Sequence, residues 1–239
     1  MKRFLLCTVI VFALFAGMTN IHLAGDTRTI TQVSTTHKVV ALTLDDGPHY
    51  KVTPEILAIL KEKQVKATFF VLGENVEHSP NLLAEEVSNG HEIGIHTYSH
   101  ASLPKLSHQR MVYEFDKAEQ VVIPLAPKPV LFRPPGGFYN ADVIDTARQR
   151  GYTVVLWSVD PKDWSCPPAS TVVEKVIENI QPGSIILLHD GQYPIPTIKA
   201  LGMIIDRLRE HGYQFVTVSE LLKYDEVRPS FNFLDRVRW

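Results

Sequence analysis

From Val39 onward, short apolar runs typical of buried strands alternate with longer segments that have helical periodicity. The seven predicted strands cover residues 39–42, 67–72, 91–95, 130–132, 153–157, 184–188 and 215–218. Alternation of this kind predicts parallel strands joined by helical crossovers, either in a barrel or in an open doubly wound sheet. With 239 residues, 45% of them apolar, the chain is long enough to bury the core of one such α/β domain.

Residues with strong end preferences locate the helices. Thr53-Pro54-Glu55 predicts a helix start, with Thr53 as the cap and Pro54 at the first helical position. Ser219 is predicted to cap a short final helix. The other predicted helices cover residues 82–87, 109–122, 141–150, 171–180 and 198–210.

The amino terminus has the composition of an export segment. A basic Met1-Lys2-Arg3 precedes an almost unbroken apolar run from Phe4 to Met18, which is short for a membrane span. Because no well-defined cleavage site follows, residues 1–24 are predicted to be either a signal peptide or an uncleaved membrane anchor. The expected location is therefore secreted or cell-surface, with a membrane tether in the second case. The polar residues 25–38 are predicted to be a linker, and residues 225–239 a carboxy-terminal tail.

Charge and cysteine content exclude some classes of partner and some means of stabilisation. The formal net charge is −2 and Lys and Arg form no block, so nucleic acid is not an expected partner. Of the two cysteines, Cys7 lies in the apolar amino-terminal run, which leaves Cys166 without an intramolecular partner in a mature chain. Without a disulfide, the stability of the domain must come from its core. We expect the protein to be a monomer.

Polar residues gather just beyond the carboxyl ends of the predicted strands. They are Asp45, Asp46, His96, Arg133, Asp160, Asp163 and His189. In parallel α/β folds these ends share one face, so residues far apart in the sequence are expected to meet there.

His96 and His100 have the spacing of a metal-binding pair. On a helical turn the two imidazoles would lie on one face, and a carboxylate from the Asp45-Asp46 pair would complete a site with two histidines and one carboxylate. A His-x-x-x-His pattern alone is weak evidence, because surface histidines adopt this spacing by chance. A pair of adjacent carboxylates at an equivalent strand end strengthens it.

Five segments in order resemble the polysaccharide deacetylases of carbohydrate esterase family 4, the NodB-homology domain, over residues 39–222. The segments are Thr43-Leu44-Asp45-Asp46-Gly47-Pro48, His96-Thr97-Tyr98-Ser99-His100, Arg133-Pro134-Pro135-Gly136, Asp160-Pro161-Lys162-Asp163-Trp164 and Ile186-Leu187-Leu188-His189. The resemblance implies a distorted (β/α) barrel of about seven parallel strands as a catalytic domain over residues 39–224.

The resemblance also implies a role for each matching residue. Asp46, His96 and His100 would hold a divalent metal, most often Zn²⁺, with Co²⁺, Ni²⁺ and Mn²⁺ as alternatives. Asp45 would be the general base, His189 the general acid, Arg133 the partner of Asp45, and Asp163 the partner of His189; on spacing alone, Asp160 could also take that last position. The backbone N–H of Gly136 would hold the oxyanion.

The substrate rim departs from the family pattern. Trp164 and Leu187 would wall the pocket for the acetyl methyl group, as in the family. Many members carry Tyr where this chain has Gly136, and Phe138 or Tyr139 could replace that ring. Tyr193 lies in an unusually apolar run after His189 and could stack on a sugar ring.

These residues predict a metal-dependent N-deacetylase of polysaccharides that contain N-acetylglucosamine, with peptidoglycan and chitin oligomers as the leading substrates. One alternative keeps the fold and metal but cleaves O-acetyl esters of xylan. An alternative of another class is a non-catalytic glycan-binding protein, which the complete set of metal, acid and base residues argues against.

Overall fold

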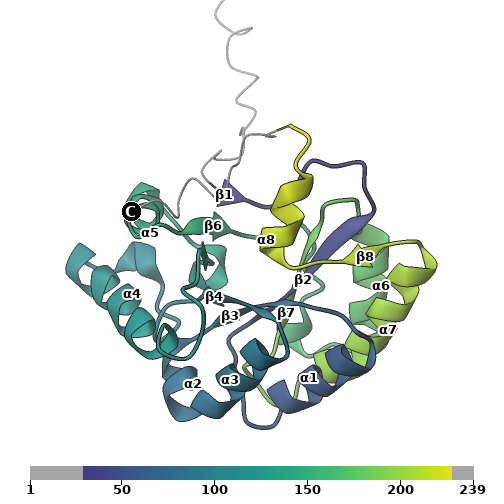
Figure 1. The fold of residues 1–239 in the computed structure, drawn as a ribbon, viewed down its shortest axis with the longest axis horizontal. Helices are drawn as coiled ribbons and strands as arrows, with labels where there is room; N and C mark the ends of the chain where they lie inside the picture. Colours follow the sequence, from purple (N-terminus) through teal and green to yellow (C-terminus); the bar gives the residue numbers. More distant parts are fainter. Residues whose placement is uncertain (1–28, 228–239) are drawn as a thin grey trace, which may run out of the picture.

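Eight strands pair into one curled sheet in the computed structural model, which describes residues 29–227 (Figure 1). The strands are β1 (Thr29–Ile30), β2 (Val39–Asp45), β3 (Thr68–Val71), β4 (Glu92–Ile95), β5 (Leu131–Phe132), β6 (Thr153–Val155), β7 (Ile185–His189) and β8 (Gln214–Phe215). Their order is β1-β6-β5-β4-β3-β2-β7, with β8 pairing with β2 outside this path. All the ladders between these strands are parallel.

Isolated bridges bring the two ends of the sheet together. Val159, after β6, pairs with Ile186 of β7, and Gln32, after β1, pairs with Ser184 just before β7. The sheet is thus an irregular barrel, which confirms the predicted distorted (β/α) barrel. β1 is an additional strand: it lies in the predicted linker and pairs with β6, and Val33 beyond it is buried. Residues 29–33 are therefore part of the barrel wall, whereas residues 34–38 form a largely exposed connection to β2.

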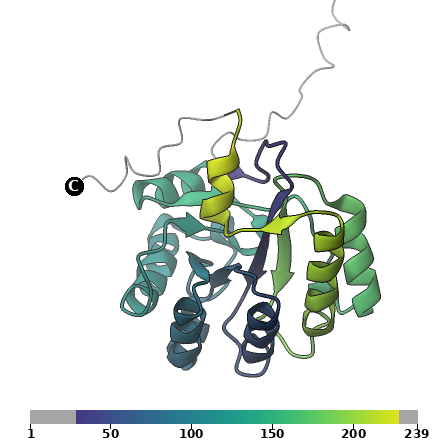
Figure 2. The same cartoon turned by 45° about the vertical axis from the view of Figure 1, so that its right-hand side comes forward.

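Helices surround the sheet on its outer side (Figures 1 and 2). They are α1 (Thr53–Glu62), α2 (Gly73–His78), α3 (Pro80–Ser88), α4 (His108–Val122), α5 (Ala141–Gln149), α6 (Ala169–Asn179) and α7 (Thr197–Glu210). The short helix α8 (Val218–Leu221) lies instead at one end of the barrel. The sequence pattern predicted all of them except α2, which starts directly after β3 at Gly73 without a capping side chain.

Two predicted caps are wrong. Val52 is the N-cap of α1, and Thr53 is the first helical residue; its hydroxyl instead donates to Asp190 Oδ2. Thr217 caps α8 in a reciprocal arrangement with Glu220, so Ser219 is inside the helix. The Thr53 hydroxyl is thus taken by a tertiary partner, whereas Ser219 loses the capping role to Thr217, which lies two residues earlier.

The core has an inner and an outer layer, because alternate residues of a strand face opposite sides of the sheet. The outer layer, between sheet and helices, includes Leu42, Leu44 and Phe69. The inner layer, within the barrel, is small and consists mainly of Val39, Ala41, Phe70, Leu131, Val155 and Ile185. Val218 and Leu221 of α8 pack into this inner layer and close the end of the barrel where the strands begin.

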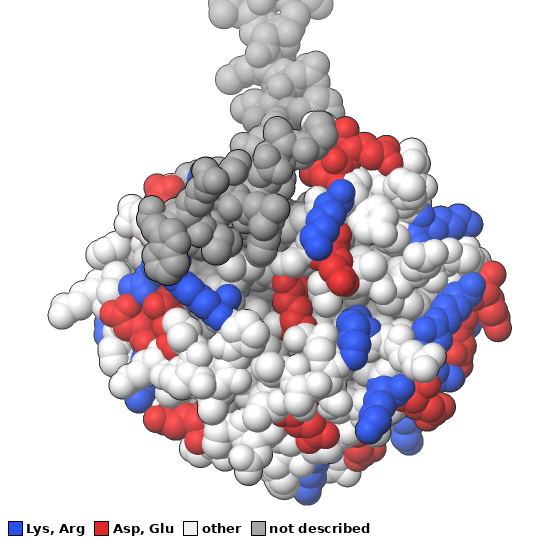
Figure 3. Space-filling view, in the orientation of Figure 1, with Lys and Arg blue, Asp and Glu red and all other residues white. Residues whose placement is uncertain are grey.

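Charge on the described surface is mixed. On the face shown in Figure 3, basic and acidic side chains are interspersed, without an extended patch of basic residues. No helix among residues 29–227 combines the length and apolar character needed to span a bilayer. The predicted export segment and most of the predicted tail lie outside the described residues. The tail begins on the barrel, where Glu226 accepts hydrogen bonds from Thr35 and Thr36.

Two buried carboxyl groups lie beside α1. Glu86 of α3 is fully buried, and neither of its carboxyl oxygens has a hydrogen-bond partner within the described chain. Burial, and then the nearby charge of Asp190, raise the pKa of Glu86 well above its ordinary value. Burial likewise raises the pKa of Asp190 to about 7, against the opposing effect of the Thr53 hydroxyl. Glu86 therefore favours the protonated form in the folded chain at neutral pH.

We predict that Glu86→Gln makes stability less sensitive to alkaline pH. A carboxyl whose pKa is raised on folding contributes stability that is complete below the unfolded pKa of about 4.3 and is lost as pH rises toward the folded value. Between about pH 5 and about pH 8, the free energy of unfolding should fall by at least about 1 kcal/mol less in the variant than in the parent. Chemical denaturation at the two pH values measures this. Glu85→Gln, at an exposed position of the same helix, is the control; equal pH slopes for the parent and Glu86→Gln would contradict the prediction.

Candidate active site

The inner rows of the strands carry the candidate residues above the apolar layer. In β2, Thr43 and Asp45 continue the inward row of Val39 and Ala41. The same two-residue step leads from Ile185 to Leu187 and His189 in β7. One step beyond inward-facing Gly94 and Leu131 come His96 and Arg133, respectively. The period of the strands thus delivers four candidate residues to one end of the barrel.

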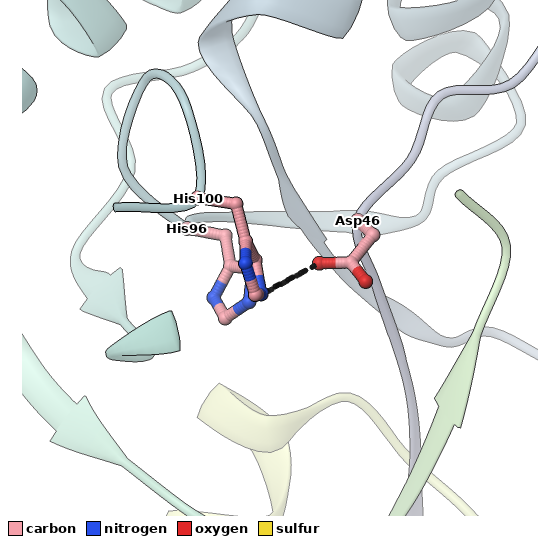
Figure 4. A group of neighbouring side chains, drawn as sticks. All are labelled: Asp46, His96 and His100. Atoms are coloured by element: carbon pink, nitrogen blue, oxygen red, sulfur yellow. Dashed lines mark ion pairs between the residues drawn. The ribbon is translucent and has the colours of Figure 1, made fainter. Parts of the chain in front are cut away.

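Asp46, His96 and His100 converge (Figure 4). The Nε2 atoms of both histidines lie 3.4 Å from Asp46 Oδ1, and one potential ligand atom from each residue falls within 4.8 Å of the others. The histidines do not share a helical turn, as the spacing had suggested. They flank an irregular loop in which Thr97 and His100 have left-handed φ angles of 71° and 59°.

Asp46 also adopts a left-handed φ, of 72°, which turns its carboxylate to the side of the preceding Asp45. Adjacent residues of a regular strand would face opposite sides. Here Asp45 Oδ2 lies 3.8 Å and Asp46 Oδ1 3.4 Å from the same nitrogen of His96. The turn after β2 therefore brings both carboxylates to one site, as the sequence predicted.

The donor set fits a divalent cation. Asp46 Oδ1 is buried and has no hydrogen-bond partner in the described part of the chain, although it faces two imidazole nitrogens. His96 Nδ1 lies 2.7 Å from the carbonyl oxygen of Arg133; since a carbonyl only accepts, Nδ1 carries the proton and Nε2 is left to bind a metal. Two imidazoles and one carboxylate with open positions are a common arrangement in catalytic metal sites.

Electrostatics also favour a cation at this position. Burial opposes the ionisation of Asp46, but His96, and then the charges of His100 and His189, outweigh it and lower the pKa of Asp46 to about 2. Burial lowers the pKa of His100 despite the nearby Asp46. This imidazole is therefore uncharged near neutral pH and has a free nitrogen lone pair for a metal. Burial would also lower the pKa of His96, but the carboxylates of Asp45 and Asp46 raise it overall. Metal binding would therefore compete with a proton on His96.

Arg133 and Asp45 form a fully buried ion pair inside the barrel. Arg133 Nη1 donates to Asp45 Oδ1 at 2.6 Å and to Thr43 Oγ1 at 2.8 Å. Its Nη2 and Nε donate to the carbonyls of Leu156 and Val155 at 2.9 and 3.3 Å. The guanidinium also lies over the ring of Phe70, 4.1 Å from its centroid. Removing one partner of such a pair leaves a buried charge uncompensated, so the two side chains depend on each other and Arg133 fixes Asp45 in position.

His189 is paired with Asp163 and not with Asp160. His189 Nδ1 lies 2.8 Å from Asp163 Oδ1, whereas Asp160 accepts from the backbone N–H of Lys162. Asp163 is held in turn by the backbone N–H of His189 and the hydroxyl of Thr197. Burial favours neutral His189, but its interaction with Asp163, reinforced by Asp45 and Asp46, raises the pKa of His189 to about 9.

The rim residues differ in exposure. Leu187 is buried, whereas Trp164 and Tyr193 are about half exposed, at 49% and 56%. Gly136 has a left-handed φ of 62°, and a Cβ at this position would lie 2.8 Å from the ring of Phe138. Phe138, 65% exposed, thus occupies the space that a side chain at residue 136 would need.

Glu114 is a site residue that sequence reasoning missed. This buried carboxylate of α4 accepts from the backbone N–H groups of Tyr98 and Ser99 at 3.2 and 2.9 Å, and from the Ser99 hydroxyl at 2.9 Å. It thereby fixes the loop between the two metal-site histidines. Thr43 and Thr197 were also missed. The inward period of β2 could have indicated Thr43, but no local pattern marks the other two.

Comparison with known proteins gives a consistent result. The family model described as polysaccharide deacetylase matches residues 32–155. A Bacillus cereus peptidoglycan-N-acetylglucosamine deacetylase is 40% identical over 196 residues, which are 81% of this chain and 92% of that protein. A chitooligosaccharide deacetylase of Sinorhizobium fredii is 38% identical over 200 residues, with 78% and 93% coverage.

Solved structures share the fold. The Bc1960 peptidoglycan N-acetylglucosamine deacetylase, crystallised with a naphthalenyl-N-oxidanylbenzamide, superposes with a TM-score of 0.79 at 37% identity, covering 82% of this chain and 93% of that one. BA3943 of Bacillus anthracis, described as a CE4 family pseudoenzyme, superposes with a TM-score of 0.77 at 30% identity, covering 81% and 68%. The fold alone therefore does not decide whether a chain is active, and the site residues carry that argument.

We predict that Glu114→Leu weakens metal binding while Glu114→Gln largely preserves it. The glutamine amide can accept from both backbone N–H groups through its oxygen and donate to Ser99 Oγ through its nitrogen, whereas leucine can do neither. Loss of such an outer contact typically costs about 10- to 100-fold in metal affinity. Competition with a chromophoric chelator for Zn²⁺ measures this, with circular dichroism to verify folding. Equal affinity in a folded leucine variant would show that the loop holds its shape without Glu114.

We also predict that Asp163→Asn lowers the pKa of His189 by about one unit or more, because it removes the charge that stabilises the imidazolium. NMR titration of the metal-free protein measures this shift, with Asp160→Asn as the matched control. The parent should also lose stability as pH rises from about 6.5 through the folded pKa of His189, since a raised histidine pKa stabilises the fold only while the proton is bound. An unchanged His189 pKa in Asp163→Asn would contradict this assignment.

Proposed function

Because the chain belongs to the polysaccharide deacetylase family, we propose that it removes N-acetyl groups from N-acetylglucosamine residues of a polysaccharide in a metal-dependent hydrolysis. The observation that carries the proposal is the arrangement of two charge-paired groups around the candidate metal site. Asp45, held by Arg133, and His189, held by Asp163, are register partners on the paired strands β2 and β7. A base and an acid thus lie side by side next to Asp46, His96 and His100.

When bound, a divalent cation would polarise the acetyl carbonyl and acidify the attacking water. Asp45 takes the proton of that water, and its buried pairing with Arg133 holds the carboxylate in position for this task. The backbone N–H of Gly136 stabilises the developing oxyanion. His189 donates a proton to the departing nitrogen; a pKa of about 9 means that it holds this proton at neutral pH.

Zn²⁺ is the metal we propose, with Co²⁺, Ni²⁺ and Mn²⁺ as alternatives to be compared. Two imidazole nitrogens and one carboxylate suit zinc, and three protein ligands leave room for water and substrate. Leu187 and Trp164 would border the acetyl group, and Tyr193 and Phe138 the sugar, in line with their positions at this end of the barrel.

The export pattern of residues 1–24 supports action outside the cytoplasm, in a secreted or membrane-tethered form. Peptidoglycan and chitin oligomers are the substrates named for the relatives, and we propose them as the candidates for this chain. We propose that the domain acts as a monomer.

We predict that a chain lacking the first 24 residues releases acetate from peptidoglycan or chitin oligomers, is silenced by a chelator, and recovers with Zn²⁺. Asp45→Asn should lower kcat by about 10²- to 10⁴-fold, because it removes the general base while keeping the shape of the side chain. Asp160→Asn, outside the acid and base set, is the control. Acetate release is measured side by side on peptidoglycan, chitin oligomers and acetylated xylan.

Two outcomes would contradict the proposed N-deacetylase function and favour one of its alternatives. Release from xylan alone would make the chain an O-acetyl esterase. Glycan binding with a bound metal but no release from any of the three substrates would favour a non-catalytic glycan-binding protein.

A further inference from the structure

Two loops leave the metal site together. The loop after β2 and the loop after β7 pack so closely that a Cβ at Gly191 would lie 2.3 Å from Asp46 Cβ. A Cβ at Gly47 would likewise lie 2.3 Å from Asp190 Oδ2. The backbone N–H of Asp190 also donates to the carbonyl of Asp45 at 3.0 Å. The residues that follow in both loops are therefore held beside the metal ligand Asp46.

The outer parts of these loops place an exposed cation between two exposed rings. Lys51 Nζ lies 4.9 Å from the ring centroid of Tyr193 and 5.5 Å from that of Tyr50. Tyr193 is 56% exposed and Tyr50 is 68% exposed. The ring of the preceding residue, His49, stacks on the ring of Tyr50, with centroids 4.8 Å apart. The ion pairs of residues 29–227 do not include Lys51. Its charge is thus positioned by aromatic faces and left without a carboxylate partner.

This combination suits an acidic sugar better than a neutral one. Tyrosine faces can stack on the apolar face of any pyranose ring, so they do not distinguish chitin from peptidoglycan. An ammonium group distinguishes the two, because chitin oligomers carry no carboxylate, whereas bacterial wall glycan carries lactyl or peptide carboxylates next to its N-acetylglucosamine. The Asp45 and Asp46 carboxylates would not repel such a group strongly, since Arg133 neutralises the first and a bound cation the second.

We infer that Tyr50, Lys51 and Tyr193 form a subsite for a carboxylate-bearing sugar that flanks the reacting N-acetylglucosamine. This inference rests on the proposed deacetylase function and specifies its substrate class as an acidic glycan. The rings hold the sugar, and Lys51 pairs with its carboxylate. Because the pair is exposed, its contribution is modest: about fivefold in kcat/KM, and sensitive to salt.

The test compares one glycan in two charge states. The full-length Zn²⁺-loaded enzyme is given oligomers of N-acetylglucosamine and N-acetylmuramic acid with free lactyl carboxylates, and the same oligomers with those carboxylates converted to methylamides. Chitotetraose is the neutral reference, and oligomers with stem peptides show whether a peptide carboxylate can replace the lactyl one. The parent should prefer the free acid by about fivefold, and added NaCl should reduce this preference.

Lys51→Gln should remove the preference by slowing the free acid alone, and Lys51→Glu should reverse it. Lys61→Gln, an exposed lysine farther along α1, should leave it unchanged. Tyr193→Ala should slow all substrates alike, since stacking does not depend on the carboxylate. An equal loss on acid and methylamide in Lys51→Gln, or no preference in the parent, would overturn the inference.

Acetate release from chitotetraose reports the deacetylase function independently of the subsite. If no substrate is deacetylated, the proposed function fails, and the subsite is judged by calorimetric binding of the free-acid and methylamide oligomers to the parent and to Lys51→Gln. Equal affinities in that titration would overturn the subsite as well.

Discussion

The fully buried pair of Arg133 and Asp45 is the interaction on which the rest of the site depends. A guanidinium inside an α/β barrel is tolerable only if its donors find acceptors, and here they reach Asp45, Thr43 and the carbonyls of Val155 and Leu156. These partners belong to β2, β6 and the residue after β6, so the charge requires the sheet to curl. Arg133 in turn lies between the apolar interior and the candidate metal site, and it orients the Asp45 carboxylate. Fold and chemistry are linked through one side chain.

The two-residue period of the strands explains why such distant residues meet. Inward positions of β2 and β7 are apolar at the start of each strand and polar at its end, where Asp45 and His189 face each other across the ladder. α8 closes the opposite end with Val218 and Leu221. The barrel therefore has one apolar, closed end and one polar, open end. This polarity follows from where the apolar run stops along each strand.

The strands and the residues at their ends could be predicted from the sequence because both signals are local: apolar runs give the strands, and polar residues follow them directly. The family resemblance supplied the roles. What could not be predicted depends on partners distant in sequence. Glu114 acts on a loop formed by earlier residues, and β1 is too short for a recognisable period and exists because β6 offers it an edge. Thr53 resembles a cap but donates to Asp190, which comes into reach only when β7 lies beside β2.

Selectivity among glycans must come from the loops, since the barrel interior has little freedom to vary. Its inner positions are filled by a small apolar layer and by charged groups whose hydrogen bonds are largely fixed. A substitution there would disturb the reaction itself before it changed which glycan is bound. The rim is different. Phe138 occupies the space beside Gly136, and Tyr193 and Lys51 extend from loops that pack on Asp46 yet remain exposed at their tips. Exposed side chains on a rigid base can change charge or shape at little cost in stability, so substrate choice can change while the interior of the barrel stays the same.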